Sequence, residues 1–543
     1  MSLVLGPVLR HVGETTAQVW VQTSAAATVT VLGSSTRTFE VAGHHFALVA
    51  VTGLRPDART PYTVEVDGER VWPLPSSPYP QSVIPTRGPK TAGRAQLVFG
   101  SCRYTKVADR RLSRQLGIDA LDAYSARMAR APVDEWPEAL LLLGDQVYAD
   151  ELTPQHRRRV ATRGDRHPDW PDDEIVGFDE YVGLYADAWS DPEIRWILST
   201  VPTAMIFDDH DVRDDWNTSA AWRDEMRATS WWQTRIRSAL ASYWVFQHLG
   251  NLSPEALAAD PDWQRLREHD GDAWPLLEAL ADRADAVIDS ATDGAKGVRF
   301  SFRWDVGRTR IVMIDSRNGR ILDDGQHLML GDGEFDWIEQ QVSAFGEVDH
   351  LVLGTSLPWL LPHAISELET VNEIAAGKPG RRGQLAERVR QAADLEHWAA
   401  FRTSFDRLTA LIARAASGGV ASVSVLSGDV HHSYAAKAEP ADAEPGAAPV
   451  HQLVCSPVHN KLQWFVPIGF RAAWSRLATR LTDSWATRAG AQPKRVTWTK
   501  IAGPFFGNTI ATLRLDGRSA AAVFEQPVTA ASLVERTRLE LAP

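Results

Sequence analysis

Seven short apolar segments between residues 96 and 456 constrain the fold of this chain more than any other feature of its sequence. They are QLVFG (96–100), ALLLLG (139–144), TAMIF (203–207), RIVMID (310–315), HLVLG (350–354), SVSVLSG (422–428) and HQLVCS (451–456). Such runs are typical of strands that are buried on both faces of a sheet. Because long stretches with helical spacing separate them, the chain is predicted to form a layered α/β fold, with sheet at the centre and helices outside.

Three of the intervening stretches are too long to be simple connections. They span residues 151–200, 215–300 and 362–415, and they are rich in Trp, Arg, Asp and Glu. Insertions of this length are more often functional covers than passive links. Two further β-rich pieces, TIATLRLDG and SAAAVFEQ, close the chain.

The first part of the chain has a different pattern of apolar residues. From Leu3 to about Leu74, short β-patterned segments alternate with turns, which predicts a small antiparallel β-sandwich of fibronectin III-like or Ig-like type. Six prolines then interrupt residues 73–89, as expected of an extended linker. We therefore expect a sandwich at 1–74, a linker at 75–92 and one large domain with helical insertions at 93–543.

Composition limits the function classes. The 543 residues carry a net charge of −12, with 44% hydrophobic and 23% charged residues, which is ordinary for a globular protein. Binding to nucleic acid or to an anionic membrane would need a local basic patch, and the run RRRV (157–160) is interpreted as part of a solvated insertion, so neither partner is expected. With two cysteines, no export signal and no run of membrane-spanning length, a cytoplasmic protein is expected.

The stretch LLLGDQVYAD (141–150) holds the first candidate ligands. Asp145 follows a buried strand, at the edge where open α/β sheets place their ligands, and Tyr148 comes three residues later. A carboxylate can bridge two cations, and a phenolate can bind a hard metal such as ferric iron. The alternative is an ordinary Gly-Asp turn.

Three other strand ends carry similar chemistry. Strand QLVFG ends at Cys102, which is a thiolate ligand or, alternatively, a small buried apolar residue. Strand TAMIF runs into DDHDVRDDWN (208–217), whose five carboxylates repel one another unless cations neutralise them; a solvated acidic loop is the alternative. Strand SVSVLSG ends at Asp429, with His431 two residues on.

Together these edges resemble a known family. SCRY, GDQVYAD, DDHD and SGDVHHS are similar, in order and separation, to the motifs of the calcineurin-like metallophosphoesterases, and more closely to the alkaline phosphatase D (PhoD-type) branch. IDSRNGR (314–320) is similar to the Asp-Thr-Arg signature of the same branch. The resemblance covers nearly the full length and implies a four-layer αββα sandwich preceded by the small β-sandwich.

The resemblance also implies a set of site residues. Cys102, Tyr148 and His431 would hold Fe³⁺, Asp145 would bridge, and Asp209 and Asp429 would hold Ca²⁺; two divalent ions such as Mn²⁺ or Zn²⁺ are the alternative. His210 would face the leaving group without binding metal. The edge after HLVLG, which reads Thr355 to Trp359, lacks the amide-bearing ligand that the family pattern suggests.

These features predict a hydrolase that uses a metal-activated hydroxide to cleave a small-molecule phosphate ester, as a phosphomonoesterase or a phosphodiesterase. Arg103 and Arg213 could bind the phosphoryl oxygens, with ion pairing as the alternative. Asp211, Asp214 and Asp215 could orient ligands or complete a third cation site.

Two readings compete with this one, a binding or scaffolding protein with a degenerate phosphatase domain and a metal hydrolase of another ester. Five tryptophans could line the cleft or simply pin the insertions to the core: Trp231, Trp232, Trp359, Trp464 and Trp498. The oligomeric state is left open.

Overall fold

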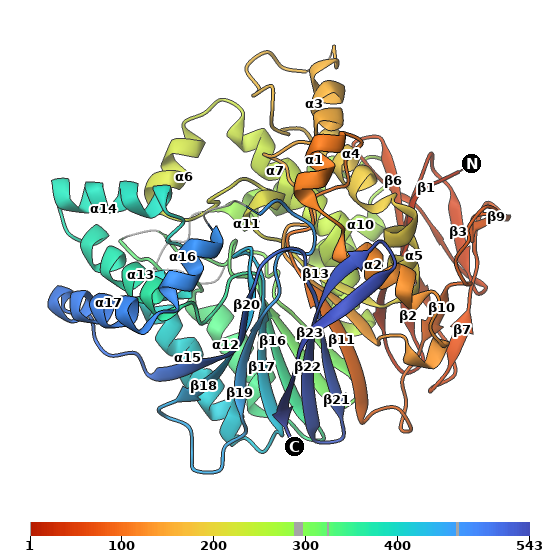
Figure 1. Cartoon of the computed structure of the whole chain (residues 1–543). Coiled ribbons are helices and arrows are strands. Elements are labelled where there is room, and N and C mark those ends of the chain that lie inside the picture. The colour runs from red at the N-terminus through yellow and green to blue at the C-terminus, as the bar shows by residue number, and fades with distance from the viewer. Residues whose placement is uncertain (1, 165, 287–296, 323–324, 463–465) are drawn as a thin grey trace.

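The structure is a computed structural model that describes residues 2–164, 166–286, 297–322, 325–462 and 466–543. Two β-sheets lie at its centre (Figure 1). The first has the order β13-β12-β11-β21-β22-β23, formed by β11 (Arg94–Gly100), β12 (Ala139–Leu143), β13 (Thr203–Ile206), β21 (Ile510–Asp516), β22 (Ser519–Thr529) and β23 (Ser532–Ala542). Within it β11, β12 and β13 are parallel.

The second sheet has the order β14-β15-β16-β17-β19-β18-β20. Its strands are β14 (Phe302–Val306), β15 (Thr309–Ile314), β16 (His350–Thr355), β17 (Ser422–Ser427), β18 (Ser433–Pro440), β19 (Val450–Val454) and β20 (Val496–Phe505). The two sheets pack face to face, because one buried apolar cluster contains Leu97 and Leu141 from the first and Met313 and Val352 from the second.

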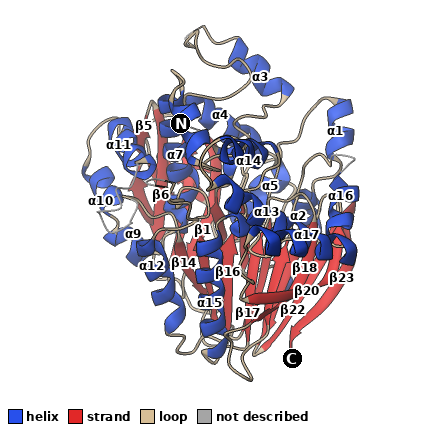
Figure 2. Cartoon of the chain, turned by 90° about the vertical axis from the view of Figure 1, so that its left-hand side faces the viewer, coloured by secondary structure: helices blue, strands red, loops and turns tan. Residues whose placement is uncertain are grey.

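Helices cover the outer faces of both sheets (Figure 2). The first sheet is covered by α2 (Ala120–Met128), α4 (Phe178–Trp189), α5 (Pro192–Thr200) and α7 (Trp232–Tyr243), and the second by α12 (Asp332–Ser343) and α15 (Arg402–Ser417). Separate apolar clusters fill these two outer interfaces. The predicted αββα layering is confirmed.

The remaining helices belong mainly to the insertions. They are α1 (Arg110–Leu116), α3 (Pro154–Ala161), α6 (Ala220–Arg227), α8 (Leu249–Asn251), α9 (Pro254–Ala259), α10 (Pro261–Glu268), α11 (Trp274–Asp285), α13 (His363–Ala376), α14 (Arg381–Ala392), α16 (Val466–Ala473) and α17 (Arg476–Ala489). Residues 287–296 of the second predicted insertion lie outside the described part. No described helix has the length and apolar character needed to cross a membrane.

All nine strands expected in the large domain are present, with ends that shift by a few residues. Four strands were not expected: β14, β18, β20 and β23. Their sequences weaken the signal of a buried strand, since β18 is rich in alanine and β23 (SLVERTRLELA) alternates charged with apolar residues along a half-exposed edge.

The N-terminal part forms two four-stranded sheets, in the orders β1-β2-β6-β5 and β4-β3-β8-β9. The strands are β1 (Leu3–Val12), β2 (Ala17–Thr23), β3 (Thr28–Val31), β4 (Ser34–Arg37), β5 (Phe39–Val41), β6 (His44–Val51), β8 (Val64–Val66) and β9 (Glu69–Trp72). One apolar cluster, with Val19, Val29 and Val64, lies between the sheets. This part is therefore sandwich-like, as expected.

The sandwich is joined closely to the large domain. The Trp20 ring lies 6.0 Å from that of Trp189 on α4, and the buried Arg10 guanidinium donates to the Asn251 side-chain oxygen at 2.8 Å. Within the Pro-rich segment, β10 (Val83–Pro85) pairs with β7 (Arg59–Pro61). The boundaries at residues 74 and 92 stay predictions.

Candidate metal centre and active site

The carboxyl ends of β11, β12, β13 and β17 carry the predicted ligands, and the backbone at these ends is strained. Cys102, Asp145, Asp429 and His431 have φ values of 56°, 49°, 64° and 48°. The left-handed region is uncommon for residues other than glycine, and such residues cluster at functional sites because the surrounding fold must hold them there.

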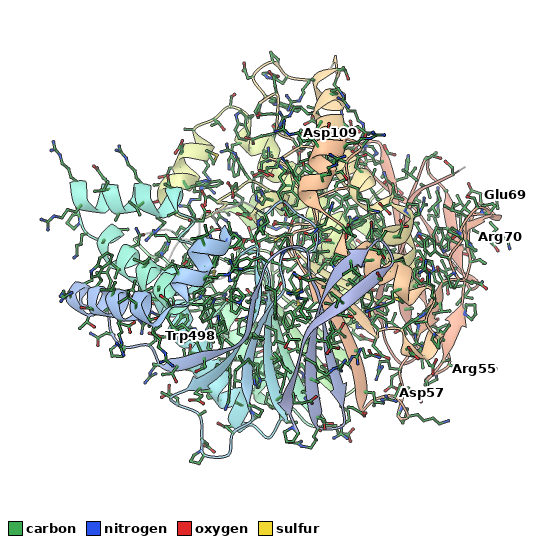
Figure 3. All side chains as sticks on the ribbon, viewed as in Figure 1. Arg55, Asp57, Glu69, Arg70, Asp109 and Trp498 are labelled. Carbon is green, nitrogen blue, oxygen red and sulfur yellow. The ribbon has the colours of Figure 1, made fainter. Side chains whose placement is uncertain are left out.

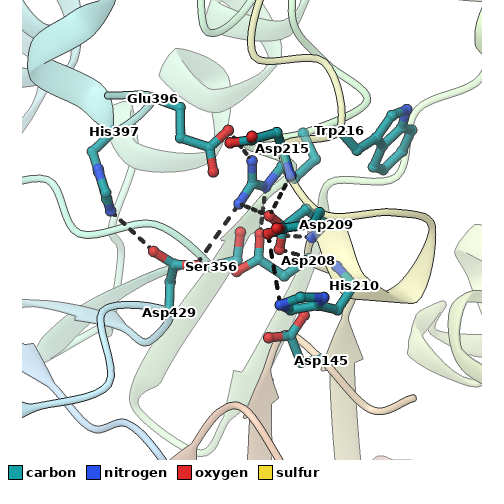
Figure 4. Close-up of polar contacts among 12 residues, drawn as sticks. Asp145, Asp208, Asp209, His210, Asp215, Trp216, Ser356, Glu396, His397 and Asp429 are labelled. Atoms are coloured by element: carbon teal, nitrogen blue, oxygen red, sulfur yellow. Dashed lines mark hydrogen bonds and ion pairs between the residues drawn. The ribbon is translucent and has the colours of Figure 1, made fainter. Parts of the chain in front are cut away.

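Two acidic groups form where these ends meet (Figure 4). Ligand atoms of Asp145, Asp209 and His210 lie within 4.8 Å of one another, and so do those of Asp208, Asp209 and Asp429. Asp209 belongs to both groups and therefore lies between them. The structure thus brings together three predicted metal ligands, Asp145, Asp209 and Asp429, from three different strand ends.

The three residues predicted to bind iron lie beside these groups. The Tyr148 hydroxyl is 3.3 Å from Asp145 Oδ2, and Asn460 Nδ2 lies 2.8 Å from that hydroxyl and 3.5 Å from His431 Nε2. One amide thus touches both Tyr148 and His431. Cys102 is fully buried below them, with its sulfur 3.2 Å from Ser456 Oγ and 3.8 Å from the Asp429 carbonyl oxygen.

The donor set fits cations. Asp145 is buried, and its Oδ1 finds no hydrogen-bond partner among the described residues. Burial, together with the charges of Asp208 and Asp209, raises the pKa of Asp145 well above its usual value despite the opposing effect of His210. Burial lowers the pKa of His431 to about 4, which keeps its imidazole neutral and able to bind a metal. A positive charge between these carboxylates would relieve their repulsion.

The thiol of Cys102 is also affected by the charges of these carboxylates. Burial, followed by the charges of Asp145 and Asp429, raises its pKa well above the usual value. A bound cation reverses this effect, because coordination deprotonates a thiol. Its geometry leaves both predicted readings open, a thiolate ligand and a small buried side chain.

Arg317 lies at the back of the acidic groups and was not singled out from the sequence. Its buried guanidinium pairs with Asp208 and Glu396, lies 3.2 Å from Asp209 Oδ2 and lies 3.8 Å from Asp429 Oδ1. Asp208 is therefore held by arginine on one side, whereas Asp209 and Asp429 also face the cavity. The only sequence signal for this role was the IDSRNGR segment.

His210 is paired with a carboxylate that sequence reasoning missed. Its Nδ1 lies 2.9 Å from Asp150 Oδ1, and its ring lies 4.7 Å from that of Tyr148. Burial opposes protonation of His210, but the charge and hydrogen bond of Asp150, together with the charges of Asp209 and Asp145, outweigh it and raise the pKa of His210 well above its usual value. His210 also belongs to one acidic group, although the resemblance implied a residue that binds no metal.

A histidine that was not predicted from the sequence, His397, reaches the site from the 362–415 insertion. His397 Nε2 lies 2.9 Å from Asp429 Oδ2, and its Nδ1 lies 2.8 Å from Glu369 Oε1 on α13. This contact orients the Asp429 carboxylate. On the neighbouring edge, Ser356 Oγ lies 2.9 Å from Ser316 Oγ, and Ser356 belongs to neither acidic group.

The remaining carboxylates of the acidic segment differ in position. Asp211 points inward and accepts from the Asp208 amide at 3.0 Å and from Gln247 at 3.2 Å. Asp214 Oδ1 lies 3.8 Å from His210 Nε2, and the Asp215 amide donates to Asp209 Oδ2 at 3.1 Å. These contacts suit orientation of the neighbouring side chains.

The geometry does not support the prediction that Arg103 and Arg213 bind substrate. Arg103 is buried, with its Nε 2.8 Å from Asp119 Oδ2, and Arg213 lies 3.2 Å from Glu174. Neither lines the cavity at the acidic groups. Each guanidinium is already neutralised by its partner, so the alternative of ion pairing describes both.

The acidic groups form the floor of a cavity of about 640 Å³. Six of the seven predicted metal-site and catalytic side chains line it, all but Cys102: Asp145, Tyr148, Asp209, His210, Asp429 and His431. One wall is apolar, with Leu361, Ile365, Val430, Val466 and Phe470. Lys461 is the only lysine or arginine among the described lining residues.

The tryptophans pack elsewhere. Trp359 is fully buried. Trp498, which is labelled in Figure 3, stacks on His363, and their ring centroids are 4.2 Å apart. Trp232 makes an edge contact with Trp222 of α6. Those described do not line the cavity, which favours the alternative that they pin the insertions; Trp464 lies outside the described residues.

Comparison with known proteins relates part of the chain to one family. Residues 118–271 match the model of a family described as PhoD-like phosphatase. The solved structure described as "Structure of PhoD" aligns with 99% of this chain and 90% of its own, at 12% identity and a TM-score of 0.58. Together the two matches support a PhoD-type phosphatase. At that identity the structural likeness by itself shows the fold alone.

The other comparisons give little information about function. Residues 1–84 match a model described as a domain of unknown function, DUF7800. The structure of maltogenic amylase from S. marinus aligns with 97% of this chain and 77% of its own at 7% identity, but its TM-score of 0.19 carries no argument. No curated protein matched the chain. The PhoD-like region contains Asp145 and His210, whereas Cys102, Asp429 and His431 lie outside it.

Proposed function

We propose that this PhoD-type phosphatase hydrolyses phosphoric monoesters, diesters or both at a centre of two cations. The observation that supports it most is the gathering of Asp145, Asp209 and Asp429, from three separate strand ends, on the floor of one cavity. Carboxylates brought this close are costly unless cations neutralise them. A scaffolding protein that binds no cations would gain nothing from the repulsion between these carboxylates.

We propose the ligands as follows. Cys102, Tyr148 and His431 would hold Fe³⁺, Asp209 and Asp429 would hold Ca²⁺, and Asp145 would serve both sites; a pair of divalent ions such as Mn²⁺ or Zn²⁺ is the alternative. When bound, the cations supply positive charge for the phosphoryl oxygens and acidify a water molecule. Support comes from the contacts of Tyr148 with Asp145 and of one amide with both Tyr148 and His431.

His210 holds the proton for the leaving group. With Nδ1 directed at Asp150, its Nε2 carries the other proton of the imidazolium. The raised pKa keeps this proton in place at neutral pH, until an alkoxide develops beside it. Asp150 acts through His210 and is a positioning residue.

The cavity supports esters with an organic group of moderate size. A volume of about 640 Å³ exceeds what a phosphoryl group needs, and the apolar wall at Ile365 and Phe470 suits an uncharged substituent. We therefore propose that small phosphodiesters enter as well as monoesters. We also propose a cytoplasmic location, because Cys102 and Cys455 are buried and unpaired, as expected in a reducing compartment.

One pair of substrates tests the proposal. Metal-loaded protein should hydrolyse an aryl monophosphate and a bis-aryl phosphate, and Asp145→Asn should abolish both activities while Arg213→Gln leaves at least half. Hydrolysis of an aryl carboxylate with no action on either phosphate would favour a hydrolase of another ester. A folded, metal-loaded protein inactive on all three would favour the scaffolding alternative.

A further inference from the structure

Helix α17 carries an apolar stripe that nothing in the described chain covers. Leu477, Leu481 and Trp485 are 70%, 55% and 56% exposed. Their spacing of four residues places them on one face of the helix. Large apolar side chains gathered in this way mark an interaction site more often than single exposed ones do.

The opposite face of the same helix is occupied. Thr482 and Ala486 are buried where α17 packs against α13 (Figure 1). A Ser475 cap begins the helix, since its hydroxyl accepts from the Ala478 amide, and Gly490 ends it in a left-handed conformation. The helix is therefore complete and anchored, and its outward stripe is not a sign of a badly packed end.

Arginines border the stripe. Arg476, Arg480 and Arg488 are exposed, and no carboxylate of the described residues forms an ion pair with them. Asp483 is the one acidic residue of the helix, so α17 is positive although the whole chain carries −12. This positive face can therefore be neutralised by an anionic partner outside the chain.

The adjacent helix α16, which contacts α17, also carries exposed apolar and basic side chains. Ile468 of α16 is 62% exposed, and Arg471 of α16 is also exposed. Residues of α16 on its other side, Val466 and Phe470, line the catalytic cavity. An object bound to the exposed sides of α16 and α17 lies next to that cavity.

We propose that this surface, Ile468, Leu477, Leu481 and Trp485 with their bordering arginines, docks on an anionic lipid bilayer. A helix with leucine and tryptophan on one side and arginine beside them is the pattern that lies in a membrane interface. Tryptophan favours the headgroup level, and arginine stems can rest on apolar surface while the guanidinium reaches lipid phosphates. The sequence suggested no membrane, because these residues form a patch only once α17 is packed on α13.

Vesicle sedimentation tests the proposal with the full, metal-loaded chain. Binding should be at least tenfold tighter to vesicles of 70% phosphatidylcholine and 30% phosphatidylglycerol than to pure phosphatidylcholine, and should weaken in 0.5 M NaCl. Leu477→Gln/Leu481→Gln/Trp485→Gln should reduce binding at least tenfold. Arg476→Gln/Arg480→Gln/Arg488→Gln should remove the preference for the anionic lipid.

A matched control uses exposed apolar residues elsewhere. Val528→Gln/Val534→Gln, on β22 and β23, should leave vesicle binding unchanged, because these residues lie outside the proposed surface. Circular dichroism and phosphatase activity in solution should be the same for all variants. Binding that the α17 variants do not change, or no binding at all, would overturn the proposal. So would a dimer in sedimentation velocity that the Leu-Leu-Trp variant abolishes, since a second copy would then cover the stripe.

Discussion

Replacing Arg317 by methionine is the perturbation whose effect the structure specifies most fully. The guanidinium is fully buried and faces four carboxylates: Asp208, Asp209, Glu396 and Asp429. Methionine keeps much of the volume and removes the charge. Asp208 should be affected most, because it is completely buried, Arg317 pairs with its Oδ1, and its Oδ2 has no hydrogen-bond partner among the described residues.

The magnitude follows from the burial of these pairs. Two unit charges about 4 Å apart interact by about 4 kcal/mol at an effective dielectric constant of about 20. Removing one partner of a buried ion pair costs about 3–5 kcal/mol, because the other charge is left in the interior. We expect Arg317→Met to lower the free energy of unfolding by this amount in the presence of a chelator. The loss should be smaller with metals bound, since cations then neutralise Asp209 and Asp429.

Urea unfolding followed by circular dichroism, with and without chelator, measures this loss. Asp208→Asn/Arg317→Met should recover at least about 1 kcal/mol relative to Arg317→Met, because the stranded charge is gone. Arg213→Met is the matched control: its side chain is 29% exposed, and a loss of about 1 kcal/mol or less is expected. If Arg317→Met in chelator were no less stable than Arg213→Met, the assigned role of Arg317 would be wrong.

Two further changes probe the centre, and a third probes a buried histidine outside the cavity. Cys102→Ala should remove most of the iron while the circular dichroism spectrum is retained, and an unchanged iron content would show that the thiol is no ligand. Asp150→Asn should move the alkaline limb of the kcat profile to lower pH by at least about one unit, because the charge that raises the pKa of His210 is lost and its proton leaves sooner; an unmoved limb would place the acid elsewhere. His248 is buried, and burial lowers its pKa to about 3, so the stabilisation from its neutral form is complete above about pH 6.5 and is lost as the pH falls towards the folded value. His248→Phe should therefore reduce the loss of stability between pH 7.5 and pH 5.0 by about 2 kcal/mol relative to wild type, and equal losses would contradict the assignment.

The strand ends were predictable because a buried apolar run followed by Asp or Cys is a local pattern. It located Asp145 and Asp209, whose parallel strands β12 and β13 end at one edge of the first sheet, and Asp429, which follows β17 of the second sheet. Tyr148 and His431 followed from the same motifs. A layered α/β fold was predictable because its central strands are continuous apolar runs, whereas the four-layer αββα order followed from the resemblance to the metallophosphoesterases.

The partners of these residues were not predictable from local pattern. Glu396 and His397 follow a helix in an insertion and reach Arg317 and Asp429 only through the packing of α13, which no periodicity indicates. Asn460 touches Tyr148 across 312 positions of sequence. Arg103 and Arg213 were predicted to bind substrate because they lie next to ligand motifs in the sequence. Such adjacency does not determine the direction of a long side chain, and both point to carboxylates outside the cavity.

Elemental analysis of protein purified without added metal, with activity measured before and after chelation, tests the central claim most directly. The account predicts about two cations per chain, iron with calcium or a divalent pair, and activity that chelation removes and metal restores. Protein that hydrolyses phosphate esters with no stoichiometric metal, and that chelation leaves unchanged, would contradict it.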